Sequence, residues 1–196
     1  MGCTWASHAV CAFALFWFSS TCERLFSFRQ LIHPLTKRPP NQTSPQTNAN
    51  LILQQIKIRV AEESDLSALI RFNQLMAWET EQKKLDEVIL SKGVAALIAD
   101  HNKGFYLVAE QDSKVVGSLM VTTEWSDWRN GVFWWVQSVY ISPEFRRQGV
   151  YAHLYAQVKI LAEQQKNICG FRLYVEKENL IAQKTYEALG MVESHY

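Results

Sequence analysis

An arginine pair followed by a glycine is the most informative group of residues for chemistry. Arg146 and Arg147 precede Gly149, and a helix is predicted to begin at Val150. The first backbone N–H groups of a helix have no partners within it and lie at the positive end of its dipole. A glycine lets a ligand approach the backbone closely, and two guanidinium groups suit phosphate oxygens. The segment is a candidate anion site, with an ordinary loop and solvated arginines as the alternative.

A second group of residues shares one face of a later predicted helix. Asn179, Ala182 and Tyr186 are spaced three and four positions apart, so they lie on the same side of that helix. Gly190 stands where a glycine commonly ends a helix. The ordinary roles for these positions are a helix cap for Asn179 and a core aromatic ring for Tyr186.

A third candidate is a loop that combines acidic and tryptophan side chains. Glu124, Trp125, Asp127 and Trp128 occur within five positions. Carboxylates beside indole rings suit a cationic amine through ion pairing and cation–π attraction. We therefore predict a substrate contact here, with a hairpin tip carrying solvated acids as the alternative.

The elements that must position these residues can be predicted from hydrophobic periodicity. Strands are expected at 56–60, 104–110, 114–123, 132–141, 171–175 and 191–196, and helices at 66–76, 85–99, 150–161 and 179–189. The order β-α-α-β-β-β-α-β-α-β predicts a mixed α/β fold. Its first half is largely antiparallel, and a strand–helix–strand crossover follows.

The chain of 196 residues is long enough for one domain with an extension. Residues 36–50 hold three prolines and no large apolar side chain, so we expect a linker there. Residues 1–50 are therefore predicted to be a poorly structured extension, and 51–196 the folded domain. The apolar run at 9–18 is about half of the ~20 residues that span a bilayer, so no stable membrane span is expected.

Charge and cysteine content limit the partners and the compartment. The net charge is +1, and residues 51–196 alone carry −2, so no basic face for nucleic acid is expected. Three of the four cysteines lie within 1–50, which leaves Cys169 without an internal partner in the domain. A reducing, cytoplasmic location is predicted, and targeting by residues 1–35 to an organelle or the secretory route stays open.

Taken together, the arginine–glycine loop and the Asn179 helix resemble two ordered motifs of the GNAT superfamily of acetyl-CoA-dependent N-acyltransferases. The resemblance spans residues 56–196. The loop pattern Gln/Arg-x-x-Gly-x-Gly/Ala is met by Arg146 and Gly149, whereas Tyr151 replaces the last small residue. Family members usually continue past the last strand, which leaves open whether the final hairpin is complete at Tyr196.

The resemblance implies a strongly twisted sheet and an N-acetyltransferase that uses acetyl-CoA as co-substrate, without a metal. The cofactor-binding residues that it implies are Val139, Tyr140, Ile141, Arg146, Arg147, Gln148, Gly149, Val150, Tyr151, Ala152 and Asn179. Backbone amides of the loop would hold the pyrophosphate, and the strand before it would pair with the pantetheine.

For catalysis, the resemblance implies direct attack by a primary amine in a ternary complex, with Tyr186 as the acid that protonates the departing thiol. Glu124 is our predicted base, with Trp125, Asp127 and Trp128 as substrate contacts. Glu79 and His195 are further candidates for the base. A small-molecule amine is the expected acceptor, while a protein amine and a homodimer stay open. The alternative function is a non-catalytic acyl-CoA-binding module.

Overall fold

The computed structural model describes residues 23–29 and 56–193. The strands are β1 (Glu23–Arg29), β2 (Lys57–Val60), β3 (Gly104–Gln111), β4 (Lys114–Ser126), β5 (Gly131–Ile141), β6 (Ile168–Glu176) and β7 (Val192–Glu193). The helices are α2 (Leu66–Glu81), α3 (Glu87–Ala99), α4 (Val150–Glu163) and α5 (Leu180–Ala188). From β2 onward this order is the predicted one, which confirms the fold class.

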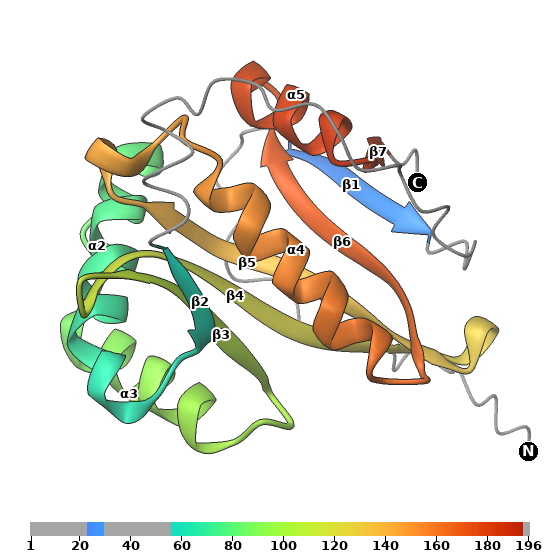
Figure 1. The fold of residues 1–196 in the computed structure, drawn as a ribbon, viewed down its shortest axis with the longest axis horizontal. Coiled ribbons are helices and arrows are strands. Elements are labelled where there is room, and N and C mark those ends of the chain that lie inside the picture. The colour runs from blue at the N-terminus through green and yellow to red at the C-terminus, as the bar shows by residue number, and fades with distance from the viewer. Residues whose placement is uncertain (1–22, 30–55, 194–196) are drawn as a thin grey trace, which may run out of the picture.

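All of these strands form one sheet with the order β2-β3-β4-β5-β6-β1-β7. Neighbours from β2 to β5 are antiparallel. Short turns join β3 to β4 and β4 to β5, whereas α2 and α3 lie between β2 and β3. β5 and β6 are parallel, and α4 is the crossover between them. Figure 1 shows α4 lying across the sheet, with its first turn near the end of β5.

Two apolar cores fix the helices on opposite faces of the sheet. Leu107 and Ala109 of β3 belong to the core that contains α4, whereas Tyr106 and Val108 belong to the core formed with α2 and α3. Successive residues of a strand point to opposite faces, so this alternation places α4 on one face and the α2–α3 pair on the other. A fully buried side chain of the size of Leu107 or Val108 contributes about 1.5–3 kcal/mol.

The strand β1 is a finding that the sequence did not predict. Its residues run antiparallel to β6, from Glu23 opposite Glu176 to Arg29 opposite Gly170, and it also pairs with β7. A segment assigned to the poorly structured extension therefore contributes a strand to the sheet. The rest of the predicted extension lies outside the described residues, and the domain boundary at residue 51 stays a prediction.

The parallel strands β5 and β6 separate before either one ends. Their pairing runs from Val132 opposite Ile168 to Trp135 opposite Arg172, yet β5 continues to Ile141. In this stretch, which pairs with β4 but not with β6, Ser138 has a φ of 46° next to an irregularity in the pairing with β4. The gap exposes backbone groups of β5 at the end that leads into α4.

An ion pair fixes the start of α2. Arg59 of β2 donates to the two carboxylate oxygens of Asp65 at 2.6 and 2.9 Å and to Glu110 at 2.7 Å. The backbone N–H of Glu62 donates to Asp65 at 2.8 Å. Burial opposes ionisation of Asp65, but the hydrogen bonds from Arg59 and Glu62 outweigh it and hold its pKa below the ordinary value. The ionised carboxylate therefore stabilises the fold.

Replacing Asp65 by Asn is expected to destabilise the domain at neutral pH. The side chain is only 4% exposed, so the loss should be on the order of 2 kcal/mol, as for a hydrogen bond to a charged group. A lowered native pKa contributes stability above the unfolded value of about 3.9, and this is lost as pH falls through the native pKa. Thermal unfolding against pH should show the two proteins converging below about pH 4. A constant difference at every pH would contradict the assignment.

Candidate functional site

A pocket of about 670 Å³ opens where β5 separates from β6. Its walls come from four places: the end of α2, the end of β5, the loop into α4 with the first turn of that helix, and one side of α5. The lining residues are Met76, Glu79, Thr80, Val139, Tyr140, Ile141, Phe145, Arg146, Arg147, Gly149, Val150, Tyr151, Ala152, Asn179, Ile181, Ala182, Thr185 and Tyr186. Elements from both faces of the sheet thus meet at this gap.

The start of α4 has backbone geometry that suits the anion site predicted from the sequence. Gly149 is the N-cap with a φ of 85°, and the backbone N–H of His153 closes the first turn onto the Gly149 carbonyl at 3.2 Å. The amides of Val150, Tyr151 and Ala152 precede that bond, so they have no partner in their own helix. Arg147 is exposed at the rim with a φ of 62°. We call these three amides, with Gly149 and Arg147, the cradle. It combines backbone hydrogen-bond donors with a positive charge.

The Arg146 side chain lines the pocket and also makes contacts within the protein. Its Nε donates to the Ile141 carbonyl at 2.8 Å, and a terminal nitrogen donates to Glu79 at 2.8 Å. The guanidinium also lies over the Tyr140 ring, 5.3 Å from its centroid. Tyr140 donates its hydroxyl to Glu79 at 3.2 Å. Arg146 therefore ties the loop to β5 and to the end of α2.

Two tyrosine rings meet at the opposite wall of the pocket. Tyr151 lies edge-to-face with Tyr186, with 5.5 Å between the ring centroids. This contact accommodates the bulky Tyr151 ring at the loop position where the family pattern has a small residue. Burial raises the pKa of Tyr186 to about 12, so its phenol stays protonated near neutral pH. Burial likewise raises the pKa of Tyr151, whose hydroxyl has no hydrogen-bond partner in the described part of the chain.

Most of the sequence-predicted residues come together here. Every predicted cofactor-binding residue except Gln148 lines the pocket, as does Tyr186. The Gln148 side chain turns away and donates to the Glu144 carbonyl at 2.6 Å, which leaves only its backbone near the cradle. Asn179 caps α5 by accepting from the Ala182 amide at 3.1 Å.

The acidic tryptophan loop does not line this pocket, so the structure does not bring its residues together with the other predicted site residues. Glu124 is opposite Phe133, eight residues before Ile141 on β5, which is roughly 25 Å away along the strand. Figure 1 shows the β4–β5 turn at the far end of β5 from α5. Trp125 and Trp128 are 66% and 87% exposed, and Asp127 lies in the same turn. The turn lies at the amino end of β5, whereas the pocket lies at its carboxyl end.

Glu124 has structural partners at that distant position. Its carboxylate accepts from Arg172 at 2.9 and 3.0 Å and from the indole N–H of Trp135. The Arg172 guanidinium in turn lies 3.7 Å from the Phe133 ring centroid. These contacts join β4, β5 and β6 and explain why an acid occurs among aromatic residues. They give Glu124 no access to the pocket as a base.

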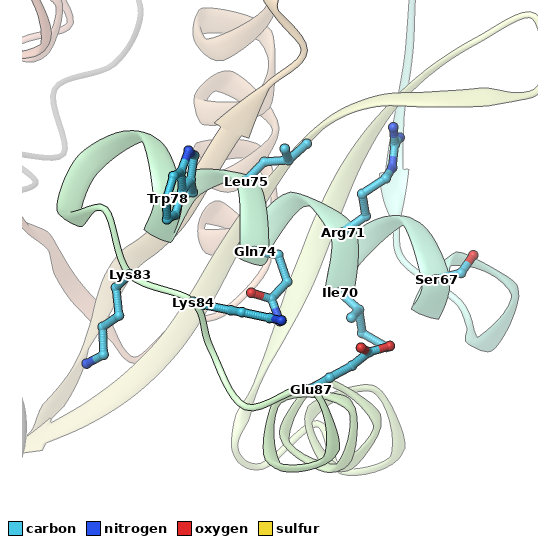
Figure 2. Close-up of a pocket in the computed structure, with 9 residues that line it drawn as sticks. All are labelled: Ser67, Ile70, Arg71, Gln74, Leu75, Trp78, Lys83, Lys84 and Glu87. Atoms are coloured by element: carbon cyan, nitrogen blue, oxygen red, sulfur yellow. The ribbon is translucent and has the colours of Figure 1, made fainter.

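A second hollow, of about 590 Å³, lies along the outer side of α2. Figure 2 shows its side chains, which come from α2, the α2–α3 loop and the start of α3: Ser67, Ile70, Arg71, Gln74, Leu75, Trp78, Lys83, Lys84 and Glu87. None of the predicted site residues lines it. The Gln74 side chain exchanges hydrogen bonds with the Leu85 backbone at 2.9 and 3.1 Å, so this region holds the loop in place.

The end of α2 supplies the lining that sequence analysis largely missed. Met76 and Thr80 were not predicted, and Glu79 was only a secondary candidate for the base. Their distance along the chain from the loop, about 70 positions, gives no sequence signal of proximity. Glu79 does lie outside the apolar stripe of its helix, which is the one local hint. His195 lies outside the described residues.

Comparison with known proteins assigns the chain to a protein family. The family model described as "Acetyltransferase (GNAT) family" matches residues 66–191, which include the pocket walls from α2 to α5. The chain belongs to the GNAT acetyltransferase family. A comparison with curated proteins finds no match.

Solved structures of acetyltransferases share this GNAT fold. A "possible acetyltransferase" from Clostridium difficile 630 is 49% identical, with a TM-score of 0.68, over 72% of this chain and 93% of that one. A predicted acetyltransferase with acetyl-CoA from Clostridium acetobutylicum is 18% identical, with a TM-score of 0.59, over 71% and 91%. An aminoglycoside N-acetyltransferase in complex with CoA is 17% identical, with a TM-score of 0.61, over 72% and 90%.

Two further features of the described residues concern metal binding and membrane insertion. Within 23–29 and 56–193, no three or more His, Cys, Asp and Glu side chains cluster in a way that could hold a metal ion. In the same residues, no helix combines the length and apolar character needed to cross a membrane. Acetyl-CoA-dependent acetylation is the chemistry that the family membership supports.

Proposed function

We propose that this chain transfers the acetyl group of acetyl-CoA to a primary amine, by direct attack while both substrates are bound. One observation carries the proposal: a single pocket joins the first amides of α4, the end of β5 that has no partner on β6, and the protonated phenol of Tyr186. These three features are what a diphosphate, an extended amide-bearing arm and a departing thiolate would need.

The residues present fit acetyl-CoA. The amides from Gln148 to Ala152 would hold the diphosphate, and Gly149 leaves their approach open. Backbone groups of Val139–Ile141, which have no partner on β6, would pair with the pantetheine. The buried hydroxyl of Tyr151 lines the same pocket and has no partner among the described residues, so a ligand would satisfy it.

Tyr186 would act as the general acid. Acetyl-CoA supplies an activated acetyl thioester, and its departing sulfur leaves more easily when it receives a proton. A phenol with a pKa of about 12 remains protonated across the neutral range and can donate. An N–H group of β5 would polarise the thioester carbonyl. Aminoglycoside acetyltransferases among the structural neighbours support a small amine as the acceptor.

Replacing Tyr186 by Phe is expected to lower kcat about 100-fold while the Kd for acetyl-CoA stays within about threefold, because proton donation matters after binding. Calorimetry with acetyl-CoA and thiol release across a panel of amines would measure both. Tyr174→Phe is the matched control, since Tyr174 is exposed on β6 outside the pocket lining. Acetyl-CoA binding without transfer to any amine would favour the non-catalytic module instead.

A further inference from the structure

Glu79 is the carboxylate of the pocket. The pocket lining holds two arginines and several phenols, but Glu79 is its only acidic residue among those described. It projects from the last turn of α2, and its side chain is 40% exposed. Among the described lining residues, Glu79 is therefore the one that could form an ion pair with a cationic ligand.

Two neighbours fix the Glu79 carboxylate without saturating it. Tyr140 donates to one oxygen at 3.2 Å and Arg146 to the other at 2.8 Å. Tyr140 is itself held by its buried ring, which lies 4.9 Å from that of Phe72. An ionised carboxylate can accept about four hydrogen bonds, so roughly two positions remain for a ligand.

Glu79 also lies on the opposite side of the gap from the proposed acid. Tyr186 comes from α5 beside the cradle of α4, whereas Glu79 comes from α2, which covers the other face of the sheet. The separation of β5 from β6 connects the two sides. The side of the pocket formed by α4 and α5 suits acetyl-CoA. An acceptor would therefore bind on the side formed by α2.

We propose that Glu79 binds the ammonium group of an alkylamine acceptor and takes one of its protons; this rests on the proposed function. The neutral nitrogen then forms the bond to the acetyl carbon as the carbon–sulfur bond breaks. Tyr186 gives its proton to the departing sulfur and regains one from the nitrogen. The products are the amide, the free thiol and a proton, which Glu79 releases to water.

A purely structural role for Glu79 predicts different behaviour. The Glu79–Arg146 pair is about 40% exposed on both sides, and such pairs contribute about 1 kcal/mol or less. Glu79→Gln should therefore leave the protein folded. A role limited to holding the Arg146 loop would instead appear as weaker acetyl-CoA binding, with all acceptors affected alike. The groups that face Glu79 are the charged guanidinium of Arg146 from the loop and the titratable, neutral phenol of Tyr140 from β5. None of the variants below alters either group.

The test compares Glu79→Gln with Glu81→Gln, which makes the same charge change two residues along the chain, outside the pocket lining. Acetylation of the best alkylamine from the panel is compared with acetylation of hydroxylamine, which is mostly uncharged at pH 7. We expect Glu79→Gln to lower kcat/KM for the alkylamine at least about 100-fold. Hydroxylamine turnover and the Kd for acetyl-CoA should change less than threefold, and Glu79→Asp should recover part of the activity.

The other outcomes are separable. Equal losses with both acceptors, or a large change in acetyl-CoA affinity, would reassign Glu79 to positioning the loop and overturn the proposal. Glu79→Gln behaving like Glu81→Gln would overturn it as well. A wild-type protein that binds no acetyl-CoA, or acetylates no amine, would refute the proposed function itself, and this inference with it.

Discussion

Replacing Gly149 by Val is expected to abolish measurable acetyl-CoA binding, with a rise in Kd of at least about 100-fold, or ~2.7 kcal/mol. The residue caps α4 at a φ of 85° and lines the pocket beside the helix amides. A branched side chain disfavours that conformation and occupies the space through which a diphosphate would approach. Isothermal calorimetry with acetyl-CoA would measure the loss.

Backbone strain needs its own control in that experiment. Gly190 has a similar φ of 90° but does not line the pocket, so Gly190→Val adds comparable strain away from the proposed cradle. We expect both variants to unfold at a lower temperature and only Gly149→Val to lose acetyl-CoA. Equal loss of affinity in the two variants would contradict the assignment of the cradle.

Deleting residues 1–50 is expected to destabilise the domain by about 3 kcal/mol or more. The deletion removes β1, whose seven residues pair along β6 and also contact β7. Each hydrogen bond of the ladder contributes about 1 kcal/mol net, and the bare edge of β6 becomes open to association. For a domain of this size the unfolding temperature should fall by roughly 10 °C.

A shorter deletion separates the strand from the rest of the extension. A chain that lacks only residues 1–20 keeps β1 and should unfold within about 2 °C of the full-length protein. Adding a peptide of residues 20–31 to the chain that starts at 51 should restore part of the lost stability. We still expect the folded 51–196 chain to bind acetyl-CoA, because every pocket-lining residue lies within it. Identical unfolding temperatures for both deletions would argue against β1.

The sequence predicted the parts of the molecule that depend on local periodicity. The elements from β2 to β7 follow the predicted order because each has its own hydrophobic period and its own start or stop signal, such as Gly149 and Asn179. Most cofactor-binding candidates came together because they occupy the end of one strand and the first turn of the next helix. Such neighbours along the chain are also neighbours in space.

Long-range arrangement explains what the sequence did not predict. Glu124 is close to β5 in sequence, yet it lies at the amino end of that strand, and the pocket lies at the carboxyl end. Glu79 is distant in sequence and reaches the pocket only because α2 packs against the sheet. β1 was assigned to the extension because the proline-rich segment after it indicates a linker. Composition does not show with which strand a segment before a linker will pair.

The position of β1 also has a consequence for how the chain folds. This strand is made early during synthesis, but its partner residues on β6 lie about 150 positions later. It must stay unpaired until nearly all of the described chain has left the ribosome, while β3, β4 and β5 find neighbours that are local in sequence. Pairs so far apart raise the contact order, and high contact order slows folding. Docking of the first strand is therefore expected to be a late and slow event, and the period before it is when the edge of β6 is most open to association with other chains.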